Sequence, residues 1–433
     1  MDLKQKILNK QAKISVIGLG YVGLPLAIAL STSGFKVYGI DTDKNKIKSI
    51  VSGKSFIEDV KSEDLFNLIS TKNNKKNSFE VSPNYSSIEI SDVIIICVPT
   101  PLTKNKEPDI SYIQNAVHSI SEKLKLNTMV ILESTTYPGT TEEILLPVLQ
   151  SSNNRNLKAG KDFYLGYSPE RIDPGRINQT IHNTPKVVAG ITKECSKLIH
   201  TFYETIVDKV VTVSTTKTAE MVKILENTFR STNVALANEI YLICDKLGIN
   251  VWEVIDAAKS KPFGFMPFYP GPGIGGHCIP IDPHLLEWKL KTLNYNTRFI
   301  GLSSEINESM PQHWIEKTQD FLKLNNKSIK NSKILILGVA YKPDVADTRE
   351  SPSLCIIEKL ITKGAKVDYH DPLVKNITIY NNNMKSISNI SLEKNLRTYD
   401  CIIITTNHST YDWNKIQEKT SSIIDTRNAL KNN

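Results

Sequence analysis

Three glycines near the start of the chain constrain its fold more than any other feature. Gly18, Gly20 and Gly23 follow the apolar segment KISVI and precede the apolar segment LPLAIAL, so they lie where a strand becomes a helix. Glycines at this spacing allow the turn, let the backbone approach a pyrophosphate and permit close packing of the helix on the sheet. Asp41 ends the next apolar segment. A carboxylate there can accept hydrogen bonds from a ribose 2′-hydroxyl and repels a 2′-phosphate, which predicts a preference for NAD over NADP.

The other apolar segments predict an α/β chain with two similar halves. Strands are expected within residues 91–101, 127–139 and 162–170, with room for crossover helices, so the first ~210 residues are predicted to form an open parallel sheet. The second half starts at the apolar segment 333–340 and includes strands within 401–408 and 421–428. It has no G-x-G-x-x-G motif, although Gly338 and the loop from Tyr341 to Arg349 can still contribute to a nucleotide site by other contacts.

A long helix is expected between these halves. No glycine or proline interrupts the segment from Ser214 to Leu247. Apolar residues recur along it at helical steps: Val222, Leu225, Phe229 and Leu236. The predicted fold class is α/β, with two Rossmann-like doubly wound parallel-sheet domains joined by a long central helix. The expected domains are residues 1–213, the helical residues 214–326 and residues 327–433.

Composition and charge narrow the class of protein. The 433 residues carry a formal net charge of +8, but the lysines are dispersed, which argues against nucleic-acid binding and suits a small polyanion such as a nucleotide. The six cysteines form no C-x-x-C pair, which argues against a disulfide framework or a clustered zinc site and indicates a reducing compartment. No apolar stretch reaches the ~18 residues of a membrane span, so we expect a cytoplasmic protein without a membrane partner.

The segment PFYPGPGIGGHCIPIDP contains the candidate nucleophile, Cys278, with Asp282 four residues later. Its glycines and prolines exclude a regular helix or central strand. An isolated cysteine is more often a buried structural residue, so a structural Cys278 is the alternative. A nucleophilic role requires a nearby cation or hydrogen-bond donors to favour the thiolate, and Lys223 is the candidate for that help.

Lys223 and Asn227 are spaced i, i+4 on the expected central helix, so both side chains can reach the same cleft. A solvated surface pair is the alternative. His277 is interpreted as a loop residue near the site in preference to a metal ligand or base. No metal site is predicted.

Seven motifs carry a resemblance to a known family. They are VIGLGYVGLPLA, VPTPL, ESTTYPGTTEE, GYSPERIDPG, KTAEMVKILENTFR, PGPGIGGHCIPIDP and GVAYKPDVADTRESP. In this order and approximate spacing they resemble the UDP-glucose/GDP-mannose dehydrogenase family over nearly the whole chain, and its bacterial UDP-N-acetylglucosamine 6-dehydrogenase branch in particular. The resemblance implies an amino-terminal NAD-binding domain, a central helical region that forms a homodimer or higher homo-oligomer, and a carboxy-terminal domain that binds the UDP moiety.

The resemblance also implies a reaction. A sugar C6 hydroxyl is oxidised to a carboxylate with two NAD per product. Cys278 matches the nucleophile that captures the aldehyde as a thiohemiacetal and then carries a thioester to water. Lys223 and Asn227 match helix residues that stabilise the oxyanion and hold the reacting groups.

Further residues match the family by motif. Asp282 matches an acid that orders water or acts as a base, and Thr135 and Glu170 match a pair near the reacting carbon, with Glu170 a candidate for activating water or assisting proton transfer. Arg349 matches an arginine that reaches cofactor phosphates across a subunit boundary, and Lys342 is expected near the sugar or nucleotide. The expected cofactor-binding residues are Gly18, Gly20, Tyr21, Val22, Gly23, Asp41, Thr100, Thr135 and Arg349. The expected substrate-binding residues are Glu170, Arg171, Lys223, Asn227, Tyr269, Gly275 and Lys342.

Two loops bear on the substrate. The motifs SPERIDPG and GGHC differ from NPEFLREG and GGSC of the UDP-glucose branch and resemble the N-acetylhexosamine branch. The predicted function is oxidation of UDP-N-acetylglucosamine to UDP-N-acetylglucosaminuronate for surface polysaccharide synthesis. The alternatives are the same chemistry on UDP-N-acetylgalactosamine, UDP-N-acetylmannosamine or UDP-glucose, a two-electron dehydrogenase with a structural Cys278, and a non-catalytic nucleotide-sugar sensor.

Overall fold

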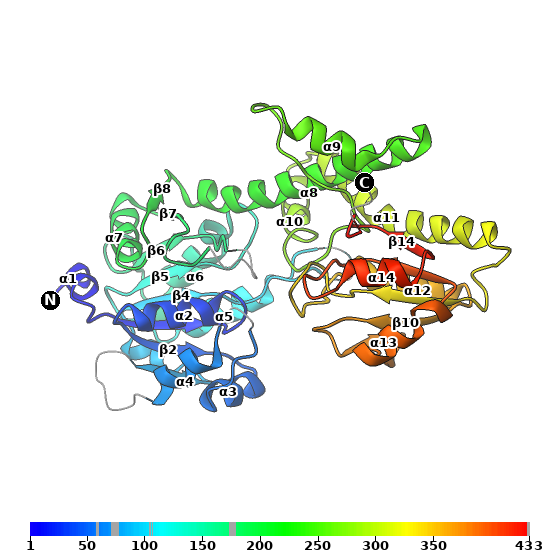
Figure 1. Cartoon of the computed structure of the whole chain (residues 1–433). Coiled ribbons are helices and arrows are strands. Elements are labelled where there is room, and N and C mark those ends of the chain that lie inside the picture. The colour runs from blue at the N-terminus through cyan, green and yellow to red at the C-terminus, as the bar shows by residue number, and fades with distance from the viewer. Residues whose placement is uncertain (58–59, 71–77, 104, 106, 173–178, 431–433) are drawn as a thin grey trace. The chain divides into compact units, whose positions relative to one another are not determined.

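The computed structural model describes residues 1–57, 60–70, 78–103, 105, 107–172 and 179–430 (Figure 1). Residues 173–175 of the GYSPERIDPG motif lie outside this part of the chain. The chain divides into two compact units, one formed by residues 1–226 and 284–295 and the other by residues 227–283 and 296–433. Each unit has its own sheet and its own hydrophobic core.

The first unit is built on an eight-stranded sheet with the order β3-β2-β1-β4-β5-β6-β7-β8. Neighbouring strands are parallel, except that β6 and β7 are antiparallel. The strands are β1 (Lys13–Ile17), β2 (Lys36–Ile40), β3 (Phe79–Ser82), β4 (Val93–Ile96), β5 (Met129–Leu132), β6 (Tyr164–Tyr167), β7 (Lys186–Gly190) and β8 (Val210–Thr212). The predicted parallel sheet is confirmed, and β4, β5 and β6 lie within the predicted ranges. The antiparallel step at β7 was not predicted.

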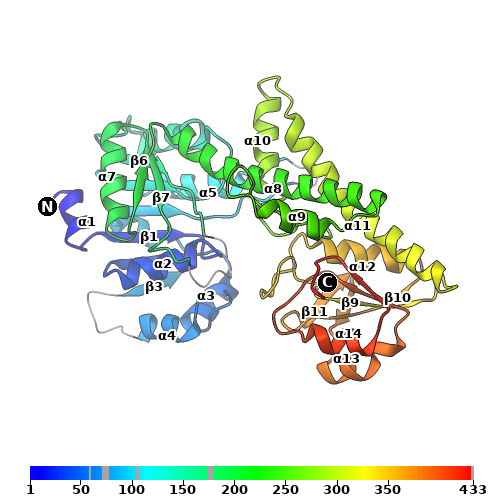
Figure 2. The same ribbon diagram turned by 45° about the horizontal axis from the view of Figure 1, so that its top comes forward.

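Helices cover both faces of this sheet, as Figures 1 and 2 show. Val93 and Ile95 of β4 pack in one core with α2 and α7, whereas Ile94 and Ile96 pack in the other with α5 and α6. Because both faces are buried, the central strands are continuous apolar runs. The helices of this unit are α1 (Leu3–Leu8), α2 (Gly23–Thr32), α3 (Lys44–Val51), α4 (Ser62–Ser70), α5 (Ser111–Ser121), α6 (Leu146–Gln150) and α7 (Lys193–Glu204), with short helical turns at Ser86–Ile90, Thr141–Leu145 and Ser152–Asn154.

The second unit contains a four-stranded parallel sheet with the order β10-β9-β13-β14, and a hairpin of β11 and β12. Helices α11 and α12 cover one face of the sheet and α13 and α14 the other (Figure 2). The strands are β9 (Lys333–Leu337), β10 (Lys366–His370), β11 (Asn376–Ile379), β12 (Asn382–Lys385), β13 (Cys401–Ile404) and β14 (Ile423–Asp425). The helices are α9 (Val251–Lys259), α11 (Arg298–Leu324), α12 (Pro352–Thr362), α13 (Asn389–Asn395), α14 (Trp413–Lys419) and the short turn Leu396–Thr398. The predicted second Rossmann-like half is confirmed.

Two helices run from one unit into the other, α8 (Thr216–Leu247) and α10 (Asp282–Lys291). The long central helix predicted from residue 214 onward is therefore confirmed as α8. It ends where Gly248 takes φ of 68°, and the N–H of Ile249 donates to the carbonyl of Cys244 at 2.9 Å, as in a Schellman motif. No helix in the described part of the chain is both long enough and apolar enough to cross a membrane.

Candidate functional site

The glycine turn between β1 and α2 has the geometry that a dinucleotide requires. Gly18 has φ of 90°, and a Cβ there would lie 2.6 Å from the carbonyl oxygen of Cys97. A Cβ on Gly23 would overlap the carbonyl oxygen of Gly18, so close packing of α2 on the sheet excludes a side chain. A Cβ on Gly20 meets nothing within 4 Å. Gly20 therefore faces open space, which suits close approach of a pyrophosphate.

Asp41 lies at the end of β2, beside this turn. Its carboxylate accepts hydrogen bonds from the N–H of Leu19 at 2.9 Å and of Asp43 at 2.9 Å, and from the Lys46 ammonium at 3.2 Å. A carboxylate has about four acceptor positions, so Asp41 can still accept from a ribose hydroxyl. Tyr21, between Gly20 and Gly23, is 37% exposed. These residues fit NAD.

Thr100 and Thr135 follow the neighbouring strands β4 and β5 and are brought together. The Thr100 hydroxyl donates to the carbonyl of Thr135 at 2.6 Å. The order β2-β1-β4-β5 places the switch point of the sheet between β1 and β4, and ligands of such sheets bind outside the carboxyl ends of the strands at that point. The two threonines therefore lie at the edge where a cofactor is expected.

Helix α8 holds the loop after Thr135 through Glu220. The fully buried Glu220 carboxylate accepts from the N–H of Gly139 and from the N–H and hydroxyl of Thr141. Lys223 lies one turn later on α8 and is only 8% exposed. Its ammonium makes no hydrogen bond or ion pair with any residue that the structure describes. A buried lysine in this state is a candidate for contact with a ligand or with a reacting group.

Glu170 follows β6, and its two oxygens are engaged separately. Oε2 accepts from the Lys186 ammonium at 3.0 Å, and Oε1 accepts from the N–H groups of Arg171 and Ile172 at 2.7 and 2.8 Å. The Arg171 guanidinium donates to Glu226 and to the carbonyl of Pro185. Glu170 is therefore fixed at the carboxyl edge of the sheet. Arg171 links its loop to α8, and its role in binding substrate stays a prediction.

The cysteine-containing loop of the second unit packs directly on the segment after β9. A Cβ on Gly275 would lie 2.6 Å from Cβ of Tyr341, and a Cβ on Gly276 would lie 2.9 Å from the Tyr341 ring. The N–H of Gly276 donates to the carbonyl of Arg349 at 2.9 Å. The loop thus needs glycine because two chain segments touch there. The half-exposed Cys278 comes two residues after Gly276 of this packed segment.

Cys278, Asp282 and Asn227 are brought together in the same unit. The N–H of Asp282 donates to the carbonyl of Cys278 at 2.8 Å, in the turn that starts α10. The side-chain amide of Asn227 on α8 donates to the Asp282 carboxylate, which is buried. The spacing of four residues between Cys278 and Asp282 therefore corresponds to one hydrogen-bonded turn.

The other residues expected to bind ligands have partners within the second unit. The Arg349 guanidinium pairs with both oxygens of Asp347 and donates to Nδ1 of His277 at 3.0 Å. The Lys342 ammonium lies 5.6 Å from the centre of the Tyr341 ring. The Tyr269 hydroxyl donates to Asp256 at 3.2 Å, and its ring stacks on Trp252. Contacts of Arg349, Lys342 and Tyr269 with ligands stay predictions.

Three models of the UDP-glucose/GDP-mannose dehydrogenase family match the chain. Its NAD binding domain matches residues 12–207, its central domain residues 217–309 and its UDP binding domain residues 335–432. The chain belongs to this family. It is an NAD-dependent nucleotide-sugar dehydrogenase, so the predicted family, enzyme class and cofactor are confirmed.

Individual members of the dehydrogenase family cover almost the whole chain. The UDP-N-acetyl-D-mannosamine dehydrogenase of Methanococcus maripaludis is 35% identical over 97% of this chain and 94% of its own length. A solved structure of UDP-D-ManNAc dehydrogenase from Pyrococcus horikoshii has a TM-score of 0.86 and 34% identity, over 97% of this chain and 96% of that one. The UDP-N-acetyl-mannosamine dehydrogenase of Staphylococcus aureus gives a TM-score of 0.81 and 31% identity, over 98% and 96%.

Three charged residues of this dehydrogenase were missed from the sequence: Glu133, Lys186 and Glu220. Glu220 precedes Lys223 by three residues and so shares its helix face, a signal that was available. Lys186 begins the apolar strand KVVAG, where a lysine is out of place. Neither signal indicates which residue the charged side chain binds, because the partners are distant in the sequence. Lys186 and Glu133 are 53 positions apart, and Glu220 and Gly139 are 81 positions apart.

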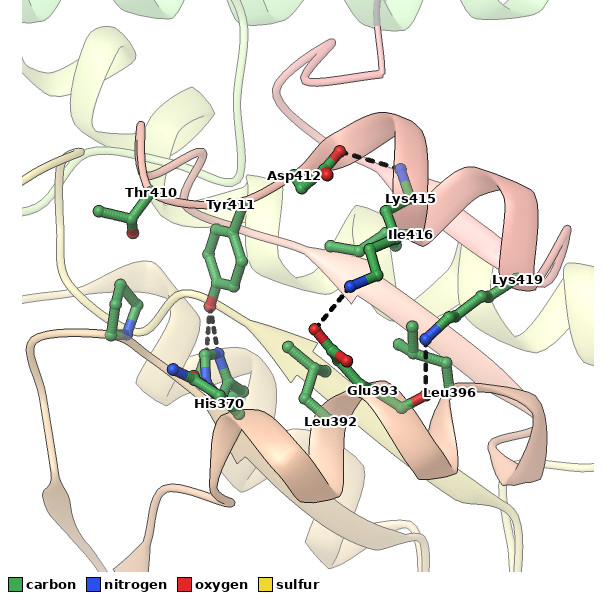
Figure 3. A pocket seen from close by; sticks show the side chains of 12 residues that line it. His370, Leu392, Glu393, Leu396, Thr410, Tyr411, Asp412, Lys415, Ile416 and Lys419 are labelled. Carbon is green, nitrogen blue, oxygen red and sulfur yellow. Dashed lines mark hydrogen bonds and ion pairs between the residues drawn. The ribbon is translucent and has the colours of Figure 1, made fainter.

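A cavity of about 240 Å³ lies between α13 and α14 of the dehydrogenase, and Figure 3 shows its lining. The His370 ring is hydrogen-bonded to Tyr411 and Asn389, and the Lys415 ammonium pairs with Glu393. The polar groups thus bind one another, and none of the predicted site residues lines the cavity. Within the described ranges, no group of three His, Cys, Asp or Glu side chains is placed to hold a metal ion.

Proposed function

We propose that this dehydrogenase oxidises the C6 hydroxyl of UDP-N-acetyl-D-mannosamine to a carboxylate through a covalent intermediate on Cys278. The observation that carries the proposal is the linked set of Cys278, Asp282 and Asn227. A thiol and a carboxylate held in one turn, with an amide of α8 bound to the carboxylate, are the groups that a covalent aldehyde oxidation uses for attack, water ordering and oxyanion binding.

The residues of the chain have distinct parts in this reaction. NAD, when bound at the glycine turn, accepts the hydride of both oxidations. The Cys278 thiolate adds to the C6 aldehyde to form a thiohemiacetal, and the thioester left by the second oxidation is cleaved by water, which returns the thiol and releases the carboxylate. Lys223 and Asn227 stabilise the oxygen that becomes negative. Asp282 orders the attacking water or accepts its proton.

The choice of sugar rests on the similar proteins. The sequence-based prediction, UDP-N-acetylglucosamine, stays a prediction, whereas its named alternative, UDP-N-acetylmannosamine, is the substrate in the names of the relatives from Methanococcus maripaludis, Pyrococcus horikoshii and Staphylococcus aureus. The two sugars differ at C2, where an inverted acetamido group changes binding most if buried polar groups lose their partners. Use of the uronate product in surface polysaccharide synthesis and a cytoplasmic location stay predictions of the sequence.

We also propose that the chain acts as a homodimer or higher homo-oligomer. Three residues of the apolar stripe on α8 are exposed in the single chain, Leu225 at 59%, Phe229 at 47% and Leu236 at 53%. Exposed apolar side chains repeated along one long helix are typical of an interface between subunits. Sedimentation equilibrium tests this proposal, and a monomer at micromolar concentration would contradict it.

The test of function is the NADH yield per limiting nucleotide sugar, measured at 340 nm with UDP-N-acetylmannosamine, UDP-N-acetylglucosamine, UDP-N-acetylgalactosamine and UDP-glucose in parallel. Two NADH per UDP-N-acetylmannosamine is the expected result. Two NADH from another sugar alone would keep the mechanism and replace the substrate. One NADH per sugar would remove the role given to Cys278, and NAD binding without turnover would indicate a sensor.

A further inference from the structure

A buried charge cluster lies at the carboxyl edge of the sheet in the first unit. Lys186 donates to Glu133 Oε2 at 2.9 Å and to Glu170 Oε2 at 3.0 Å. The side chains of Lys186, Glu133 and Glu170 are 6%, 0% and 12% exposed. The Tyr203 hydroxyl of α7 donates to Glu133. One lysine thus bridges two carboxylates, one of which is the predicted catalytic Glu170.

The antiparallel step in the sheet explains how a strand-initial lysine reaches this edge. Gly166 pairs with Gly190 and Tyr167 with Ala189, so the same register continued three residues past the end of β6 sets Glu170 opposite Lys186. In a fully parallel sheet, the first residue of a strand lies at the amino edge, away from the ligands. Reversal of β7 therefore delivers a fixed positive charge beside the loop that carries Glu170.

A contribution to stability does not by itself explain this buried charge cluster. Buried ion pairs are commonly matched or exceeded in stability by apolar residues of similar volume. The two positions that follow Lys186 are the apolar Val187 and Val188 of the same strand, both buried. An apolar residue at position 186 would meet the needs of packing, so the lysine indicates a requirement for charge at Glu170 or Glu133.

The surroundings of Glu170 identify what the lysine does for it. Burial favours the neutral acid, but the Lys186 charge and the N–H groups of Ile172 and Arg171 outweigh burial, so the pKa of Glu170 is lowered. For Glu133, burial outweighs the stabilisation of the carboxylate by Lys186 and Tyr203, so its pKa is raised. The other titratable groups that face the cluster are the buried Cys97 and Tyr203, whose pKa values are raised chiefly by burial. Among the residues that the structure describes, Lys186 is therefore the cation that faces Glu170, since the Arg171 guanidinium is bound to Glu226.

We propose that Lys186 is a positioning residue of the dehydrogenase, which keeps the Glu170 carboxylate ionised and in one orientation at the ligand-binding edge. This inference rests on the proposed function, because Glu170 serves the hydrolytic water or a proton transfer only if that reaction takes place. A fixed, ionised carboxylate can accept a hydrogen bond from water, whereas a protonated or rotated one presents a hydrogen to it.

The test compares four full-length variants by the pH dependence of kcat: Lys186→Met, Lys186→Arg, Glu133→Gln and the double variant Lys186→Met with Glu133→Gln. Lys186→Met leaves two buried carboxylates without a cation, so the acid limb of kcat is expected to rise by about one pH unit or more. At pH values on the acid side of the limb, kcat should therefore fall by about tenfold or more relative to the wild-type protein, and this loss should be recovered at higher pH. Lys186→Arg keeps a positive charge at this position, so its acid limb is expected at the wild-type pH. Glu133→Gln keeps the Lys186–Glu170 pair and leaves the limb where it is.

The double variant covers the case in which Lys186→Met fails to fold. It has the same net charge in the cluster as the wild-type protein, so it removes the lysine without adding an unpaired charge. The acid limb is again expected to rise. An acid limb at the wild-type position in the folded Met variant or in the double variant would overturn the proposal, whatever the loss of rate.

A direct titration separates this proposal from the proposed function. The carboxyl carbon of Glu170, labelled with ¹³C in glutamate and assigned by its absence in Glu170→Gln, is followed by NMR against pH. An upward shift of its midpoint in Lys186→Met or the double variant supports the role of Lys186 even if the wild-type protein oxidises none of the four sugars. An unshifted midpoint would overturn it even if the sugars are oxidised.

Discussion

The backbone N–H of Gly139 donates a hydrogen bond of 2.5 Å to the carboxylate of Glu220. The other oxygen of Glu220 accepts from the N–H and hydroxyl of Thr141 at 2.9 and 2.7 Å. One carboxylate of α8 therefore holds the loop that follows β5, one turn before Lys223. Burial raises the pKa of Glu220 to about 7, because it outweighs these hydrogen bonds.

This pKa makes stability depend on pH. Between the ordinary value of 4.5 and about 7, the folded protein keeps a proton that the unfolded chain has released. The contribution is fully present below about pH 4.5 and is lost as the pH rises to about 7, a fall of about 3 kcal/mol in the free energy of unfolding. Glu220→Gln is expected to remove this fall. Urea unfolding at intervals from pH 4.5 to 8 measures it, with Glu239→Gln on the exposed side of α8 as the control. Equal slopes in wild type and Glu220→Gln would contradict the prediction.

Substitution of Gly20 and substitution of Gly23 by alanine are expected to affect different properties, NAD binding in the first case and stability in the second. Gly20→Ala adds a methyl group in open space, so the free energy of unfolding should change by less than about 1 kcal/mol while NAD affinity falls at least tenfold. Gly23→Ala forces a methyl group onto the Gly18 carbonyl and should destabilise the fold by several kcal/mol, on the order of an overpacked core. Thermal unfolding and NAD titration by calorimetry separate the two effects. Full NAD affinity in Gly20→Ala would show that the open space is not the pyrophosphate site.

Cys278→Ala is expected to abolish formation of the carboxylate, with kcat reduced at least about 10³-fold, because the thiohemiacetal cannot form. Cys355→Ala is the matched control, since Cys355 is also half-exposed in the second unit and lies outside the predicted site. Rates are followed at 340 nm and the product by mass spectrometry. Turnover of the Ala variant close to that of wild type would support the alternative of a two-electron dehydrogenase.

Asp371 at the end of β10 is expected to be a structural residue. Its carboxylate accepts hydrogen bonds from five donors, the N–H groups of Val339, Ala340, Leu373 and Val374 and Nε2 of His408. Burial opposes ionisation, but His408 and these N–H groups lower the pKa of Asp371 to about 2. Its stabilisation is thus present above about pH 4 and is lost as the pH falls to about 2.

Asp371→Asn should cost about 3 kcal/mol or more, since an amide cannot accept all five bonds and presents its own hydrogens to donors. The control is Asp412→Asn, because Asp412 caps the exposed start of α14 and asparagine is an equally good cap, so this change should stay within about 0.5 kcal/mol. Urea unfolding at pH 7 measures both. Equal stability of the two variants would contradict the assigned network.

Asp41 and Asp371 illustrate what pattern alone can and cannot predict. Asp41 follows β2 and Asp371 follows β10. Each accepts a hydrogen bond from the N–H of the residue after the glycine that follows the neighbouring strand: Leu19 after Gly18 in the first unit, and Val339 after Gly338 in the second. Asp41 keeps acceptor capacity for a ribose, whereas the five donors around Asp371 leave none. The residue pattern is the same, and the difference comes from the additional donors to Asp371, which are the N–H groups of Ala340 and Val374 and the ring of His408, 37 positions away in the sequence.

The sequence by itself determined the features that depend on near neighbours. Strand, glycine turn and helix follow from local periodicity and from the need for φ above zero or for the absence of a Cβ, and α8 follows from a long segment without glycine or proline. The link from Cys278 to Asp282 is also local, because it is one turn of backbone. Only the tertiary structure decided the partners of charged residues. Lys186 meets Glu170 because β7 runs antiparallel to β6, and Glu220 meets Gly139 across 81 positions. A periodic pattern indicates that a side chain is buried or paired, but the order and direction of the strands determine which residues it contacts.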